Sequence, residues 1–185
     1  SARLADRVRA FFAPGGQLAR AHPSAEQRPQ QLEMSLRVLE TLQDGGCLVA
    51  EAGTGVGKTL AYLLPAVLLR QRVIVSTGTK ALQDQLATKD IPFLRRASGI
   101  PFRAAVLKGR DNYLCKHRFE IFRSQPSFGD ADEASLWPRI DAWARATELG
   151  EASELTELKE SPSFWPLVNA RNATCLGQRC ERFSE

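Results

Sequence analysis

A short glycine-rich segment carries the residues of this chain that are best suited to chemistry. Glycines stand at 53, 55 and 57, and Lys58 and Thr59 follow at once. Glycines permit a backbone path whose successive N–H groups turn inward and cradle phosphates at the positive end of a helix. The lysine adds a point charge beside the phosphates, and the threonine hydroxyl is a ligand for Mg²⁺. The segment therefore predicts a P-loop for a nucleoside triphosphate.

The flanking residues support this interpretation. An apolar run at 47–50 precedes the loop and another at 60–64 follows it, as expected for a strand, a turn and a helix in succession. The alternative, a glycine-rich turn that binds nothing, is disfavoured by this context. The predicted nucleotide-binding residues of the loop are Ala52, Gly53, Thr54, Gly55, Val56, Gly57, Lys58 and Thr59, of which Lys58 and Thr59 are also the predicted catalytic residues.

Gln31 lies upstream of the loop and is a candidate for reading the base. Its amide offers one donor and one acceptor, which match the N6 and N7 pattern of adenine. Glutamine is also common on helix surfaces, so the residue by itself is a weak signal. Its position ahead of a P-loop favours ATP as the nucleotide.

A second polar group follows the β-branched run at 72–77. Thr77, Thr79 and Lys80 would gather at the carboxyl end of this strand, which is the edge of an α/β sheet where ligands bind. Hydroxyls and a lysine suit contacts with phosphates. The alternative is that Thr79 caps a helix and that Lys80 is solvated.

Apolar runs and helical patterns alternate along the first part of the chain. The runs at 47–50, 72–77 and 104–107 predict strands, and the helical spacing of apolar residues predicts helices at 2–12 and from Pro29 to Gly45. Such an order predicts an α/β fold in which parallel strands are joined by right-handed crossovers, as in the first part of a RecA-like domain. After residue 128 the periodicity weakens, although Pro138 predicts the start of a further helix.

Composition favours a soluble globular protein. The chain has 185 residues, 43% of them hydrophobic and 25% charged, and no apolar run reaches membrane-spanning length. No secretory signal is recognisable at the start. Residues 91–128 hold eight Lys/Arg and two Asp/Glu, a net +6, whereas residues 129–160 hold three and nine, a net −6. The basic segment suggests a surface for a polyanion, although a charge run is more often ordinary solvated surface.

Three of the four cysteines have polar surroundings. Cys47 falls in an apolar run and is interpreted as a small buried hydrophobe, whereas Cys115, Cys175 and Cys180 do not. A cytosolic P-loop protein is not expected to hold structural disulfides, which favours a metal or cluster site. Spacing leaves open zinc with a fourth ligand such as His117, an iron–sulfur cluster with a fourth cysteine, and three free thiols.

With these residues in view, the chain resembles the DinG/YoaA-type helicases, the bacterial relatives of XPD in superfamily 2. Residues 28–34 resemble the Q-motif region, 51–59 motif I, 75–83 motif Ia, and 107–115 the segment with the first cluster ligand; together with 165–168 and 175–177 they are most similar to the YoaA branch. The resemblance implies an ATP-dependent DNA helicase of DNA repair that moves 5′ to 3′ along single-stranded DNA, in the bacterial cytoplasm and at the nucleoid. Single-stranded or forked DNA and replication or repair proteins are its implied partners.

The resemblance also assigns residues. It implies that Arg28 and Gln31 bind adenine, that Thr77, Thr79, Lys80, Arg110 and Tyr113 contact DNA, and that Cys115, Cys175 and Cys180 bind a [4Fe-4S] cluster. Tyr113 could instead pack in a core. The implied domains are a lead-in at 1–26, the first part of a RecA-like helicase domain at 27–110, and an inserted, mainly helical iron–sulfur domain at 111–185.

Some of the family's pattern is absent from this sequence. Asp132 and Glu133 superficially match the Asp-Glu pair that holds Mg²⁺, but no apolar strand precedes them, so we reject this match. The fourth cysteine, the true Asp-Glu pair, the second RecA-like domain and its arginine finger are expected beyond Glu185. The chain alone is therefore expected to be an inactive amino-terminal part with an empty cluster site. Two alternatives remain, a nucleotide- or DNA-binding module without turnover and a P-loop NTPase that is not a helicase.

Overall fold

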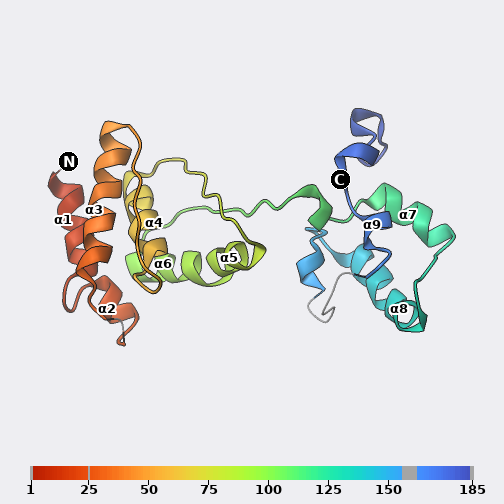
Figure 1. Cartoon of the computed structure of the whole chain (residues 1–185), viewed down its shortest axis with the longest axis horizontal. Coiled ribbons are helices and arrows are strands. Elements are labelled where there is room, and N and C mark those ends of the chain that lie inside the picture. Colours follow the sequence, from red (N-terminus) through yellow and green to blue (C-terminus); the bar gives the residue numbers. More distant parts are fainter. Residues whose placement is uncertain (1, 25, 156–161, 184–185) are drawn as a thin grey trace. The chain divides into compact units, whose positions relative to one another are not determined.

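The computed structural model describes residues 2–24, 26–155 and 162–183, which form two compact units (Figure 1). Unit 1 comprises residues 1–106 and unit 2 comprises residues 107–185. Each unit has its own apolar core. None of the helices in the described ranges is both long and apolar enough to cross a membrane.

Unit 1 is built from helices that pack around the segment after the glycine-rich loop. Its helices are α1 (Ala2–Phe12), α2 (Gln17–Ala21), α3 (Pro29–Asp44), α4 (Lys58–Leu69), α5 (Lys80–Gln85), the π-helical turn η1 (Leu86–Asp90) and α6 (Ile91–Ser98). The helices predicted at 2–12 and from Pro29 to Gly45 are confirmed. Gly45 ends α3 with a positive φ of 80°, a conformation that glycine adopts without a steric cost.

The core of unit 1 lies between α1, α3, α4 and α6. Phe11, Leu64 and Leu94 are at most 1% exposed, and α3 packs along α4. Helix α4 is apolar on almost every face, as expected of a helix surrounded by other elements. This packing fixes the first turn of α4, which carries Lys58 and Thr59.

The predicted parallel sheet is not formed among the described residues. The segments 47–50, 72–77 and 104–107 run without ladder pairing, and the described β-bridges are two isolated ones in unit 2. Val49 is 92% exposed and Ile74 is 94% exposed. A parallel sheet needs a hydrogen-bonded neighbour for each strand and helices over both faces, and neither condition is met at these segments. Cys47 is likewise exposed, so its interpretation as a buried hydrophobe was wrong.

The helical stretch from α5 to α6 contains a wide turn. Residues 86–90 form a π-helical turn directly before Pro92, which lies in the first turn of α6. Proline has no N–H to donate and its ring clashes with the carbonyl four residues earlier, so the regular α-helical pattern cannot continue through it. The turn places Thr88, Lys89 and Asp90 on the wall of a cavity described below.

Unit 2 is held together by aromatic side chains. Its helices are α7 (Lys116–Ser124), α8 (Ala131–Ala146) and α9 (Trp165–Val168), with 3₁₀ turns η2 (Arg110–Asn112), η3 (Ala152–Glu154), η4 (Asn172–Thr174) and η5 (Gly177–Arg179). Phe122 stacks on Phe164 with ring centroids 5.2 Å apart, and Trp137 lies 5.3 Å from Phe122. This mainly helical unit agrees with the helical character expected for residues 111–185.

Helix α8 begins earlier than Pro138, where the sequence predicted its start. Asp130 caps it, because the carboxylate accepts a hydrogen bond from the Glu133 N–H at 2.8 Å. The Glu133 carboxylate accepts hydrogen bonds from the Ser163 hydroxyl and from the Gly129 N–H. The bond from the Ser163 hydroxyl is the largest cause that lowers the pKa of Glu133 below its ordinary value. Asp132 and Glu133 thus belong to a helix start, which confirms that they do not end a strand.

Candidate nucleotide site

The glycine-rich loop leads directly into α4. Gly55 and Gly57 have φ angles of 80° and 81°, in the left-handed region, and Gly57 is the residue before the first turn of the helix. Gly53 does not share this conformation, although the sequence placed all three glycines in one role. The N–H groups that begin α4 carry the positive end of its dipole, which is the ordinary setting for an anion.

Lys58 folds back over the loop that precedes it. Its ammonium donates hydrogen bonds to the carbonyl oxygens of Ala52 at 2.6 Å and Gly53 at 2.9 Å. These bonds hold a positive charge at the mouth of the loop. Of the remaining predicted loop residues, Thr54 is exposed and Val56 is half-buried.

Two side chains from the start of α3 and the residue before it brace the loop. The Gln31 amide donates to the Gly57 carbonyl at 2.9 Å, and the Arg28 guanidinium donates to the Gly55 carbonyl. Gln31 is only 5% exposed. A Cβ on Gly57 would clash with the Gln31 amide and displace it from the loop, and the left-handed φ independently favours glycine at this position. The structure therefore brings both predicted base-reading residues to the loop, but with their donors on its carbonyls.

Thr59 has a hydroxyl partner one turn along α4. Its side chain hydrogen-bonds to the Tyr62 hydroxyl, and Asp90 of the π-helical turn is close enough to act on the same tyrosine. Burial is the largest cause that raises the pKa of Tyr62, and the negative charge of Asp90 adds to it, while the Thr59 hydrogen bond opposes it. Burial and the nearby carboxylate thus both favour the neutral form of the Tyr62 phenol.

A cavity of about 670 Å³ opens beside the loop, within unit 1. Its walls come from α2, the segment before α3, the first turn of α4, the π-helical turn and α6. Gly57 and Leu60 of the loop and α4 line it, as do Arg28 and Gln31. The volume lies in the range of small-molecule sites, which is about 300–1,000 Å³. The site is thus a glycine-rich loop at the start of a helix, with a cavity next to it.

The predicted DNA-contacting residues of unit 1 lie at the start of α5. The Thr79 hydroxyl accepts from the Leu82 N–H at 3.3 Å and so caps the helix, which is the role that the sequence left as an alternative. Thr77 donates to the Thr79 carbonyl, and Lys80 is exposed at the first position of the helix. An exposed lysine at a helix start can reach a phosphate.

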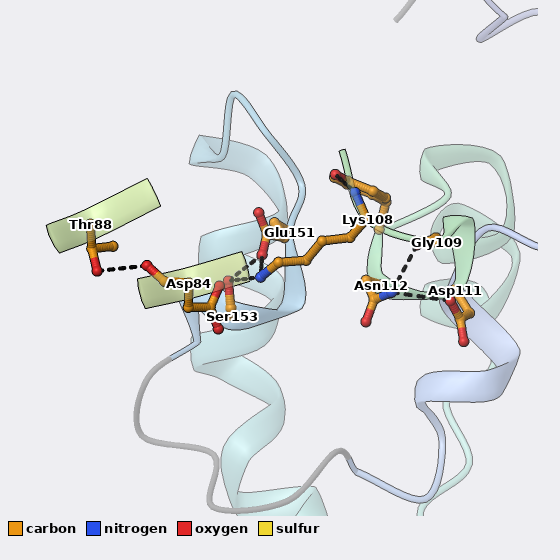
Figure 2. A network of polar contacts seen from close by, with 9 residues as sticks. Asp84, Thr88, Lys108, Gly109, Asp111, Asn112, Glu151 and Ser153 are labelled. Atoms are coloured by element: carbon orange, nitrogen blue, oxygen red, sulfur yellow. Dashed lines mark hydrogen bonds and ion pairs between the residues drawn. The ribbon is translucent and has the colours of Figure 1, made fainter. Parts of the chain in front are cut away.

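The other two predicted DNA-contacting residues lie at the start of unit 2. Arg110 is exposed in η2, whereas the Tyr113 hydroxyl accepts from the Lys108 N–H at 2.9 Å and is half-buried. Figure 2 shows that the ammonium of the neighbouring Lys108 donates hydrogen bonds to Glu151 and Ser153. The Lys108 side chain is 4% exposed. Tyr113 is therefore part of a fixed polar cluster.

The cysteines of unit 2 occupy two kinds of position. Cys115 precedes α7, and its N–H donates to the Val168 carbonyl at 2.9 Å. Cys175 and Cys180 flank η5, and Cys175 Sγ accepts from the Gly177 N–H at 3.4 Å. However, in the parts of the chain that the structure describes, no three metal-ligating side chains lie together as a site.

Some residues of the site were missed in the sequence. His22, Phe93 and Asp90 line the cavity, yet each is far from the loop in the chain. The proline at 92 inside a helical pattern was the one available signal for the wide turn.

Comparison with known proteins gives one family model and several similar proteins. Residues 30–118 match the DEAD/DEAH box helicase model. The "ATP-dependent DNA helicase YoaA" of Escherichia coli is 42% identical over 94% of this chain and 27% of its own length. The protein of that name in Haemophilus influenzae is 36% identical over 97% of this chain and 28% of its own length. The "3'-5' exonuclease DinG" of Bacillus subtilis is 32% identical over 80% of this chain and 16% of its own length. The chain thus spans about a quarter of the length of the YoaA proteins.

Proposed function

Because residues 30–118 match the DEAD/DEAH box helicase model and the chain is similar over most of its length to the YoaA and DinG proteins, we propose that it supplies the ATP-binding part of an ATP-dependent DNA helicase. The observation that carries the proposal is the loop at 52–59, because its left-handed glycines, lysine and helix start form a phosphate site. We also propose that the segments 47–50, 72–77 and 104–107 would pair as strands of a RecA-like sheet in the whole protein.

Each residue of the site has a role in this proposal. Lys58 leaves the carbonyls of Ala52 and Gly53 for the triphosphate, and the Thr59 hydroxyl holds Mg²⁺. Arg28 and Gln31 hydrogen-bond to the loop and so connect it to the start of α3. A nucleotide on the loop would therefore lie close to these two side chains, which are the predicted adenine-binding residues. In unit 2, Arg110 and Tyr113 would contact the DNA. The whole protein would move 5′ to 3′ on single-stranded or forked DNA in DNA repair, at the bacterial nucleoid.

ATP hydrolysis by the full-length protein tests the proposal. We expect turnover that single-stranded DNA stimulates and that double-stranded DNA of the same length stimulates less. Turnover that is indifferent to DNA would favour the alternative of a P-loop enzyme that is not a helicase. Binding of MgATP without any turnover would favour a binding module.

The lysine at the start of α5 gives a separate prediction about DNA. Lys80→Ala should weaken binding of a fluorescent oligo(dT) severalfold and reduce the slope of log affinity against log salt by about 0.7, the value expected for one lost phosphate contact on a single strand. Fluorescence anisotropy at several salt concentrations measures both quantities. Lys89→Ala is the matched control, because it removes the same charge farther along this helical stretch. Equal losses in both variants would argue against a specific contact at Lys80.

The cysteines of unit 2 carry a further part of the proposal. Cys175 Sγ accepts a hydrogen bond from the Gly177 N–H, but the described residues do not bring a complete ligand set together with Cys180 and Cys115. The three cysteines and the resemblance to the DinG/YoaA-type helicases support a [4Fe-4S] cluster in this unit.

A cysteine substitution distinguishes the possible metals. After anaerobic reconstitution with iron and sulfide, the full-length protein should absorb broadly near about 400 nm, as thiolate-bound clusters do. Cys175→Ser should remove most of this absorbance, and Cys47→Ser, which changes an exposed thiol of unit 1, should leave it. A colourless protein that binds one zinc ion would favour the zinc alternative, and one that binds neither metal would favour free thiols.

A further inference from the structure

The cavity beside the glycine-rich loop has an aromatic wall that the proposed function does not use. The wall is a pair of rings, His22 at the end of α2 and Phe93 in α6, with centroids 6.2 Å apart and planes inclined by 75°. Both residues line the cavity. Phe93 is half-buried and also packs against the core of unit 1, so its ring is held from behind while part of it remains accessible.

The nucleotide loop borders the same cavity. Gly57 and Leu60 line it, and they bracket Lys58 and Thr59. A ligand that places its phosphates on this loop would therefore have the rest of its body beside the cavity. The volume of about 670 Å³ accommodates a nucleoside.

The two residues that the sequence assigned to the base are engaged elsewhere. Gln31 donates to the Gly57 carbonyl, and Arg28 donates to the Gly55 carbonyl. While these bonds hold, these donors face the carbonyls of the loop, so stacking on another wall would add binding energy that they do not supply. The aromatic pair is the group in that cavity with a flat π-face, and an aromatic ring is the usual partner for a nucleobase.

We propose that Phe93, oriented by His22, is the stacking platform for the purine base of the nucleotide, and that the π-helical turn before Pro92 sets its position. The inference rests on the proposed function and adds to it a residue that determines affinity for the base. The turn brings Asp90 and Lys89 to the cavity wall beside Phe93, so the polar edge of a base would meet charged groups of both signs. Phe93 acts only on the base, because the phosphates have their own loop.

Binding of two probes to the 185-residue chain tests the inference, one with a base and one without. The probes are the magnesium complexes of AMP-PNP, a non-hydrolysable ATP analogue, and of inorganic tripolyphosphate, and their affinities are measured by isothermal titration calorimetry. Phe93→Ala should weaken AMP-PNP about tenfold, the order expected for the loss of one stacking partner. It should leave the affinity for tripolyphosphate unchanged within about twofold, since the lost ring contacts the base alone.

Three further variants separate stacking from a general loss of structure. Phe93→Leu keeps an apolar side chain in the core and should also weaken AMP-PNP selectively, whereas Phe93→Trp should retain its affinity. Phe102→Ala is the matched control, because Phe102 packs against the same core but does not line the cavity. It should leave the ratio of the two affinities unchanged.

The possible results bear differently on the two proposals. If Phe93→Ala and Phe93→Leu weaken both probes equally, or weaken neither, Phe93 is not a platform for the base and the inference is overturned, while the phosphate loop stands. If the unsubstituted chain binds neither probe, the proposed function fails for this chain, and the inference fails with it.

Discussion

Replacing Lys58 with alanine is expected to abolish the hydrolysis of ATP while leaving the fold intact. The Lys58 ammonium is the positively charged group of the loop, and it donates hydrogen bonds to the carbonyls of Ala52 and Gly53. We expect it to exchange these carbonyls for a phosphate when a nucleotide binds. Loss of a single group that stabilises charge in a transition state typically lowers turnover by roughly 100-fold to 1,000-fold. DNA-stimulated ATP hydrolysis by the full-length protein measures the effect, and far-ultraviolet circular dichroism of the chain shows whether the helices persist.

Two other lysines provide the controls for this result. Lys80→Ala should lower the affinity for single-stranded DNA and leave binding of Mg–tripolyphosphate to the chain unchanged, whereas Lys58→Ala should have the opposite pattern. Lys89→Ala removes a charge from the cavity wall outside the loop and should affect tripolyphosphate much less than Lys58→Ala does. Turnover that survives Lys58→Ala at the original rate would exclude the lysine from the chemistry and remove the main support for the proposed function.

Replacing Gly57 with alanine is expected to damage both the loop and its brace. The left-handed φ of 81° costs a residue with a Cβ about 1–2 kcal/mol, as L-residues disfavour this conformation. In addition, the new methyl group would lie 2.1 Å from Gln31 Nε2 and would displace the amide from the Gly57 carbonyl. We therefore expect a lower free energy of unfolding and binding of MgATP that is weakened about tenfold or more.

A double-mutant cycle isolates the contact with Gln31. The free energy of unfolding of the chain is measured in urea for Gly57→Ala, Gln31→Ala and the double variant. Since shortening Gln31 removes the clash, Gly57→Ala should cost less in the Gln31→Ala background, with a coupling of about 0.5–3 kcal/mol. Gly53→Ala is the matched control, because its φ is not left-handed and a Cβ there would meet nothing within 4 Å. Additive effects in the cycle would show that the bracing contact does not form.

Helices α1 and α3 of unit 1 could be predicted from the sequence, but the sheet could not be confirmed. Helix formation depends on contacts between residues three or four positions apart, so the pattern of α1 and the proline and glycine that bound α3 were sufficient. A strand depends on a partner that is distant in the chain. The segments at 72–77 and 104–107 have the composition of strands, and yet the described residues give them no ladder partners.

The start of α8 shows a different limit. Proline is frequent in the first turn of helices, so Pro138 predicted a helix that begins there. The helix already begins at Ala131. The Asp130 cap and the Glu133 carboxylate stabilise the earlier start. Glu133 depends for this on Ser163, thirty positions away, and no local pattern contains that contact.

The sequence by itself determined the glycine-rich turn that we propose as the phosphate loop, because glycine conformation, a lysine charge and a helix start are all properties of ten consecutive residues. The tertiary structure alone decided what Gln31 and Arg28 contact, and it alone brought His22 and Phe93 to the cavity beside that loop. The physical reason is the range of the interactions. A backbone turn is fixed by its own residues, whereas a cavity exists only where side chains from separate helices pack around a shared space.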